Sequence, residues 1–142
     1  MDKENREEVM INFTIPGNPA SSKNSRPIFI NKATGARFIG KSKLLKEYID
    51  RGLLELNIQK RDLSYAYKFP REMDIQVTFL FYVQDKRRRD LVNLMQAPLD
   101  LLQAAEIISD DSIVKSLDGS RIYYDKLNPR TEISIIKYKE IK

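Results

Sequence analysis

The stretch IQVTFLFYV, residues Ile75–Val83, decides the fold of this chain. Apolar side chains occupy every second position from Ile75 onward, and half of the positions between them are apolar as well. An alternation with a period of two is typical of a β-strand, whose successive side chains point to opposite faces. Because one face is wholly apolar and the other half apolar, we expect a central strand of a sheet.

Two segments with helical spacing flank this strand. Before it, apolar residues recur with a helical period from Leu44 to Leu56, and Ser42 is a candidate N-cap. After it, the segment from Leu91 to Ala105 has the same period but contains Pro98. An interior proline costs about 3 kcal/mol, so we expect either a kink at Pro98 or a short turn before a helix that begins there.

Further strands complete the predicted fold. They cover Val9–Ile15, a hairpin of Ile28–Ile30 and Arg37–Ile39, a strand from Ile113 to Leu117 that continues through Tyr124, and Thr131–Tyr138. The order strand, hairpin, helix, strand, helix, strand, strand predicts an α+β fold with a mixed β-sheet and two main helices. We expect one domain over residues 1–142, with residues 1–8 as a flexible tail.

The charge and the hydropathy of the sequence indicate which kinds of partner the chain can bind. Lys and Arg number 25 against 20 Asp and Glu, and the formal charge of +5 favours an anionic partner, of which nucleic acid is the leading candidate. No stretch approaches the roughly 20 apolar residues that span a bilayer, and the start MDKENREE lacks the apolar core of a signal peptide. We therefore expect a soluble, cytoplasmic protein that does not bind a membrane.

Two absent residue types restrict the possible chemistry. The chain has no Cys and no His, which excludes thiol nucleophiles, imidazole bases, and metals held by thiolate or imidazole. An enzyme built from this sequence is left with carboxylates that hold a hard cation such as Mg²⁺, with lysine chemistry, or with carboxylates acting alone.

Charged residues gather on both sides of the second predicted helix. The run DKRRRD, residues Asp85–Asp90, precedes this helix, and the run SDDS, residues Ser109–Ser112, follows it. Two carboxylates from different elements can hold a divalent ion, and the adjacent cations can bind phosphates. Each run alone is more often a solvated turn or a helix cap.

Taken together, these residues resemble the signature of the RusA-type Holliday-junction resolvases, which are crossover junction endodeoxyribonucleases. In that family an Arg-rich Asp-Leu-Asp-Asn-Leu-x-Lys segment precedes a helix and an Asp-Asp pair. The matching residues here are Arg87-Arg88-Arg89-Asp90-Leu91, Asn93-Leu94, Asp100 and Asp110-Asp111. The likeness extends from about Ile11 to Tyr138, and it is specific between Arg87 and Asp111.

The resemblance implies a homodimeric nuclease that depends on Mg²⁺ or Mn²⁺ and cleaves four-way DNA junctions during phage, prophage or bacterial recombination and repair. It implies that Asp90 and Asp111 ligate the metal and act with Asn93 in catalysis, with Asp110 as a neighbouring or alternative ligand. Asp100 and Gln96 are expected to support this site from further out. The residues expected to bind DNA are Lys86, Arg87, Arg88, Arg89, Lys23, Arg26 and Arg37.

Two positions depart from the family pattern. Val92 stands where the family has its second Asp, and Gln96 stands where it has a catalytic Lys. Valine cannot ligate a metal, and glutamine lacks the positive charge that stabilises a pentacovalent phosphate. A catalytically impaired relative that binds DNA or a protein partner is therefore the second hypothesis.

A third hypothesis is binding of RNA or of an acidic protein. It is less favoured, because the aromatic cluster of Phe79, Phe81 and Tyr82 fits a hydrophobic core better than a platform for bases. The nuclease hypothesis makes a sharper demand on the structure, since Asp90 and Asp111 must lie close enough to share a cation.

Overall fold

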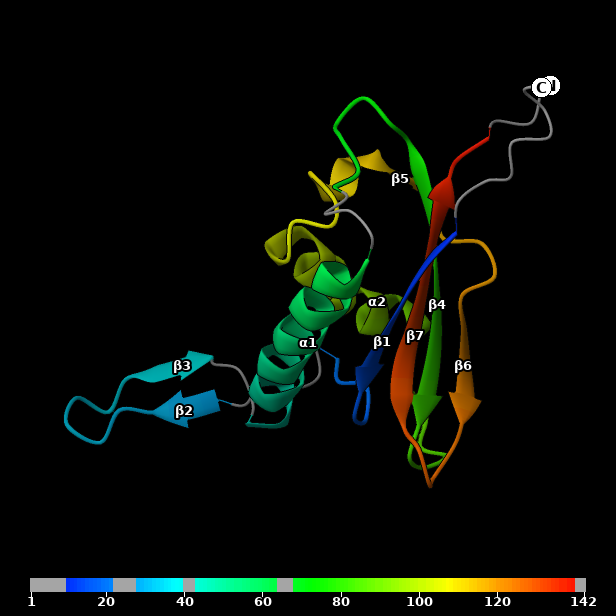
Figure 1. Ribbon diagram of the computed structural model, residues 1–142. Helices are drawn as coiled ribbons and strands as arrows, with labels where there is room; N and C mark the ends of the chain where they lie inside the picture. The colour runs from blue at the N-terminus through cyan, green and yellow to red at the C-terminus, as the bar shows by residue number, and fades with distance from the viewer. Residues whose placement is uncertain (1–9, 22–27, 40–42, 64–67, 140–142) are drawn as a thin grey trace, which may run out of the picture.

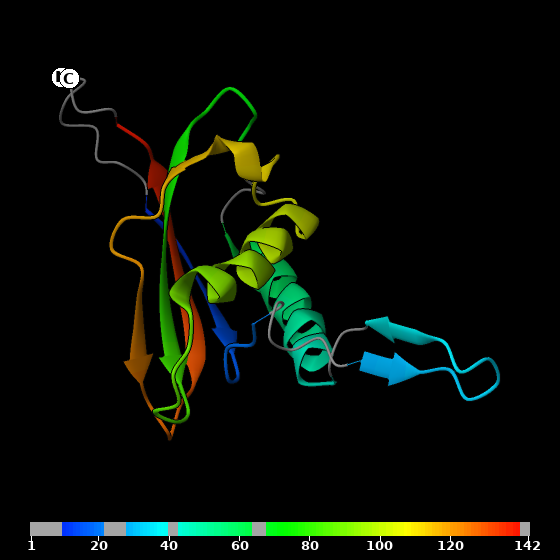
Figure 2. The same ribbon diagram turned by 180° about the vertical axis from the view of Figure 1, so that it is seen from behind.

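The protein is described by a computed structural model that covers residues 10–21, 28–39, 43–63 and 68–139. Two helices pack on one face of a five-stranded sheet, while a small hairpin projects from this two-layer body (Figures 1 and 2). The predicted α+β fold, with a mixed sheet and two helices, is confirmed. The expected tail at residues 1–8 and the expected N-cap Ser42 lie outside the described residues.

The elements follow one another largely as predicted. In chain order they are β1 (Ile11–Pro16), β2 (Ile28–Ile30), β3 (Arg37–Ile39), α1 (Lys43–Asp62), β4 (Ile75–Val83), α2 (Leu91–Ala104), the 3-10 helix η2 (Asp111–Ile113), β5 (Val114–Ser116), β6 (Arg121–Tyr124) and β7 (Arg130–Lys137). Neither of the two described α-helices is long and apolar enough to cross a membrane.

Strand β4 lies in the middle of the sheet, as its sequence predicts. One edge pairs antiparallel with β7, which in turn pairs antiparallel with β1. The other edge pairs in parallel with two short strands, with β5 beside the start of β4 and β6 beside its end. The prediction of one continuous strand through Tyr124 is wrong, because the chain turns at Asp118-Gly119, where Gly119 has a positive φ of 85°.

The hydrophobic core lies between the sheet and the two helices. Every second residue of β4, starting at Ile75, is buried against the helices, and the residues between them are half-buried on the open face. Thr131 is the one buried polar residue of the described chain, and its hydroxyl lies 2.7 Å from the hydroxyl of Tyr48. Burial raises the pKa of Tyr48, so this hydroxyl stays protonated and the pair remains hydrogen-bonded.

Helix α2 continues through Pro98, so the expectation of a helix that begins there is wrong. The Asp90 side chain caps the helix by accepting a hydrogen bond from the Val92 N–H at 3.0 Å. Pro98 is buried on the face that packs into the core, together with Leu94, Met95, Ala97, Leu101 and Leu102. Burial of this apolar face offsets the backbone hydrogen bond that the proline ring removes.

The two helices approach each other closely at Gly52. A Cβ atom at this position would lie 2.7 Å from Cδ1 of Leu101 and 3.4 Å from Cγ2 of Ile15. Gly52 weakens α1 as a helix, but it leaves the space that α2 and β1 fill.

We expect the substitution Gly52→Leu to destabilise the protein by about 2 kcal/mol or more, because a full side chain overpacks this contact. The free energy of unfolding, measured by urea denaturation, tests this expectation. Asn57→Leu is the matched control, since Asn57 lies on the exposed side of the same helix and its replacement should change stability little. Equal effects of the two substitutions would show that the helix contact is not tight.

Candidate nucleic-acid interface and metal site

A broad hollow opens where β1 ends beside the loop that follows β4. The Asn18 side chain joins these two segments by accepting a hydrogen bond from the Gln84 N–H at 3.0 Å. Gly17, with a φ of 99°, donates its N–H to the carbonyl of Pro129 at 3.1 Å and closes the corner. The first turns of α1 and α2 complete the hollow, which is lined by Pro16–Ser21, Leu44, Glu47, Tyr48, Asp50, Arg51, Gln84, Arg87–Asp90 and Leu94.

Exposed arginines line the same hollow as Asp90. Arg87 and Arg88 lie in the loop before α2 with exposed side chains, as their predicted contact with phosphate requires. Sequence analysis missed Arg51, which lines the same hollow from α1. Nothing in the amphipathic pattern of α1 distinguishes Arg51 from any other exposed helix residue, so only the fold reveals its position.

Arg89, which was also predicted to bind DNA, forms hydrogen bonds within its own loop. Its side chain is 13% exposed, and its Nη1 donates to Oδ1 of Asp85 at 2.8 Å and to the carbonyls of Asp85 and Arg87 at 3.1 Å each. The hydrogen bond from Arg89 and the backbone N–H of Arg87 lower the pKa of Asp85 to about 2. Arg89 therefore holds the loop in shape, while its neighbours Arg87 and Arg88 face solvent.

The remaining predicted residues near the hollow lie on or beside the start of α2. Asn93 is half-buried in the first turn of the helix. Val92 is 70% exposed, and one turn later Gln96 donates its side-chain N–H to Asp100 at 2.9 Å. The two positions that depart from the RusA pattern thus belong to the exposed side of α2.

The four remaining predicted basic residues lie away from the hollow or outside the described residues. Arg37 is exposed on the projecting hairpin of β2 and β3. Lys23 and Arg26 fall outside the described residues. Lys86 lies over the ring of Tyr124, 5.2 Å from its centroid, at the edge of the sheet.

Asp110 and Asp111 lie at the opposite end of the sheet from Asp90. Asp110 accepts a hydrogen bond from the Ser112 hydroxyl and lies 3.7 Å from Arg71, which precedes β4. The Ser112 hydroxyl, followed by the Asp111 N–H and the charge of Arg71, lowers the pKa of Asp110. The exposed Asp111 begins η2, immediately before Val114 pairs with Ile75 at the start of β4.

The expectation that Asp90 and Asp111 converge within one chain is therefore wrong. The 14 residues of α2 span roughly 21 Å between them, because an α-helix rises about 1.5 Å per residue. Among the described residues no group of three or more carboxylates is placed to hold a metal ion. The residues of a single chain do not fit a Mg²⁺ or Mn²⁺ ion bound by both aspartates.

Comparison with known proteins agrees with the resemblance that the sequence suggests. Residues 16–136 match the family RusA, described as Endodeoxyribonuclease RusA. No curated protein matches the chain. The family match includes β4, α2, both aspartate-containing segments and the loop of residues Asp85–Arg89 before α2, called the arginine loop.

We expect the Asp85–Arg89 pair to stabilise the loop in a pH-dependent manner. Because folding lowers the pKa of Asp85 to about 2 from about 4, its contribution is present above pH 4 and is lost as the pH falls towards 2. Thermal unfolding should show Asp85→Asn to be less stable than the parent protein at pH 7, with a difference that shrinks below pH 4. Arg89→Gln should behave alike, and an additive effect in the double variant would contradict a direct pairing.

Proposed function

The chain belongs to the family of the endodeoxyribonuclease RusA, and on this premise we propose that it cleaves DNA at four-way (Holliday) junctions during recombination and repair. The observation that carries the proposal is the family match over residues 16–136. The hollow supports it, because Arg51, Arg87 and Arg88 line it together with Asp90 and offer cations to a phosphate backbone, although Glu47 and Asp50 also line it.

Asp90 and Asp111 can hold one metal ion together only if a second chain supplies one of them, because α2 separates them within one chain. Asp90 lies in the hollow, and its Oδ1 accepts the N–H of Val92, so as a single carboxylate it offers a cation Oδ2 and the remaining lone pair of Oδ1. We propose that a homodimer supplies the rest, with Asp90 from one copy and Asp111 from the other. Two α2 helices packed antiparallel about a two-fold axis place the start of one helix beside the end of the other.

A second candidate is a member of the family that binds junctions without cutting them. Val92 and Gln96 favour it, because the exposed side of α2 carries an apolar residue and an amide in place of the family's Asp and Lys. The amide of Gln96 is engaged by Asp100 and adds no positive charge.

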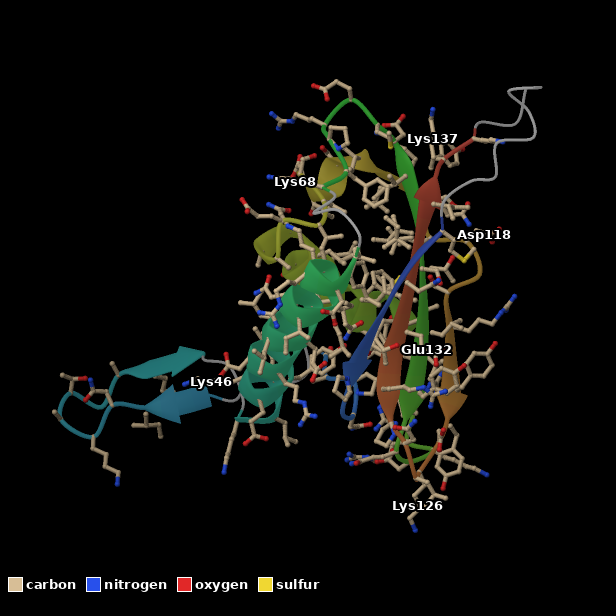
Figure 3. The ribbon with its side chains drawn as sticks, in the orientation of Figure 1. Lys46, Lys68, Asp118, Lys126, Glu132 and Lys137 are labelled. Atoms are coloured by element: carbon tan, nitrogen blue, oxygen red, sulfur yellow. The ribbon has the colours of Figure 1, made fainter. Side chains whose placement is uncertain are left out.

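Cleavage of labelled four-way junctions in Mg²⁺ or Mn²⁺ distinguishes the two candidates. We expect symmetric nicking by the parent protein and a loss of at least about 100-fold in Asp90→Asn, because the charge is removed. Asparagine caps a helix as well as aspartate does, so the fold should be kept. The matched control is Asp118→Asn, on the turn between β5 and β6 away from the hollow (Figure 3).

The outcomes of this assay separate the two functions. Tight junction binding without metal-dependent nicks would favour the binding-only candidate. Equal nicking by the parent protein and Asp90→Asn would remove Asp90 from the site.

Mixing two inactive variants tests whether one site is built from two chains. If Asp90 and Asp111 act together across a dimer, Asp90→Asn and Asp111→Asn should each be inactive alone. Co-refolding them should restore nicking at about a quarter of the parent number of sites, because half of the dimers are mixed and each mixed dimer has one intact pair. A mixture as inactive as its components contradicts a shared site, and sedimentation of the protein establishes whether dimers form.

A further inference from the structure

Three side chains form one continuous stack on the open face of the sheet. The guanidinium carbon of Arg130 lies 3.8 Å from the ring centroid of Tyr82, and the rings of Tyr82 and Tyr123 stack with centroids 5.2 Å apart. Tyr82 pairs with Arg130 on one side and with Tyr123 on the other, so the stack crosses β7, β4 and β6. Sequence analysis assigned Tyr82 to the core with Phe79 and Phe81, but its position in the alternation turns it to the opposite face.

At one end of this stack, two carboxylates hold the Arg130 guanidinium in place. Its Nε donates to Glu132 at 2.7 Å and its Nη1 donates to Asp125 at 3.0 Å. Its hydrogen bonds raise the pKa of Arg130, and the bond to Glu132 has a larger effect than the bond to Asp125. With its charge matched by two carboxylates, Arg130 acts as a support beneath Tyr82 and is not available to a phosphate.

The Tyr123 end of the stack is open. Strand β6 pairs only with β4 among the described strands, and Tyr123 is 42% exposed at this edge. In the described part of the chain its ring contacts Tyr82 and no second ring or cation. The next residue, Tyr124, points to the other side of the strand, is 49% exposed and lies under Lys86. An aromatic ring fixed on one face and open on the other is suited to stack a flat, unsaturated ligand.

Three basic residues lie on or near the strand edge that carries Tyr123, with Lys86 on its far side over Tyr124. Arg121 lies two residues before Tyr123, on the same face of β6, with its side chain exposed. Lys126 follows β6 at the tip of the sheet (Figure 3). Lys86 is joined to Arg87 of the hollow, so the loop after β4 connects this edge with the proposed cleavage site. Open aromatic rings beside a row of cations are the features that proteins use to bind single-stranded nucleic acid.

We propose that Tyr123 is a stacking platform for an unpaired base of DNA, with Lys86, Arg121 and Lys126 holding the adjacent phosphates. The inference rests on the proposed function for the identity of the DNA, and it gives that function a means to prefer branched DNA over duplex. A base in an intact duplex has no free face to offer, whereas a base beside a branch point can leave its stack.

Fluorescence of 2-aminopurine tests the platform directly. With this base next to the branch point of a four-way junction, or in a single-stranded oligonucleotide, we expect the parent protein to change the emission because the base stacks on Tyr123. Tyr123→Leu should lose this change and bind single strands about tenfold more weakly, while Tyr123→Phe should behave like the parent. Binding to a fully paired duplex should be equal for all three proteins, and circular dichroism confirms that each is folded.

The result separates this inference from the proposed function. If the parent protein nicks junctions but Tyr123→Leu binds and perturbs 2-aminopurine as the parent does, the platform is overturned and the nuclease stands. If the parent protein binds no junction, yet Tyr123→Leu loses single-strand binding that Tyr123→Phe keeps, the nuclease proposal fails and the platform stands. Equal loss in the Leu and Phe variants would also overturn the platform, because a phenyl ring stacks as a tyrosine ring does.

Discussion

The parallel pairing of β5 with β4 is the constraint on which the rest of the structure depends. A strand can pair in parallel with its predecessor only after the chain has returned to the start of that predecessor, and α2 provides this return. The start of α2 therefore lies at the end of the sheet where β4 finishes, and the segment that directly follows α2 lies at the end where β4 begins. The arginine loop and Asp90 lie at the first end, and Asp110 and Asp111 lie at the second.

This constraint explains why the sequence predicted the elements better than the site. The alternation in β4 and the helical spacing of α1 and α2 report burial directly, and each element formed where its pattern placed it. The 21 positions from Asp90 to Asp111 agree with the family pattern, but spacing in sequence does not measure separation in space. A helix fills that interval here, so the two aspartates are kept apart by the element that makes the family resemblance specific.

Within the arginine loop, the three arginines differ in exposure, and sequence spacing does not predict this difference. Arg87 and Arg88 are exposed, Arg87 also lying 3.5 Å from Asp85, whereas Arg89 is mostly covered and hydrogen-bonds to Asp85 and to two carbonyls. No pattern in a run of like charges indicates which member turns inward, since that depends on where the loop closes. A charge that is mostly shielded from water needs partners, and Asp85 together with the loop carbonyls supplies them. Tyr82 could not be placed from its residue type either. It belongs to a largely apolar strand, yet its ring lies on the open face of the sheet.

The position of Asp90 at the start of α2 has a consequence for tracing the descent of such proteins. Its carboxylate satisfies a backbone N–H of the helix, whatever else it does. Selection for stable folding alone can therefore preserve this aspartate in a lineage that has lost nuclease activity. An inactive descendant would keep the aspartate of the motif and would first lose the motif residues that have no structural role. Asp90, Val92 and Gln96 show this combination.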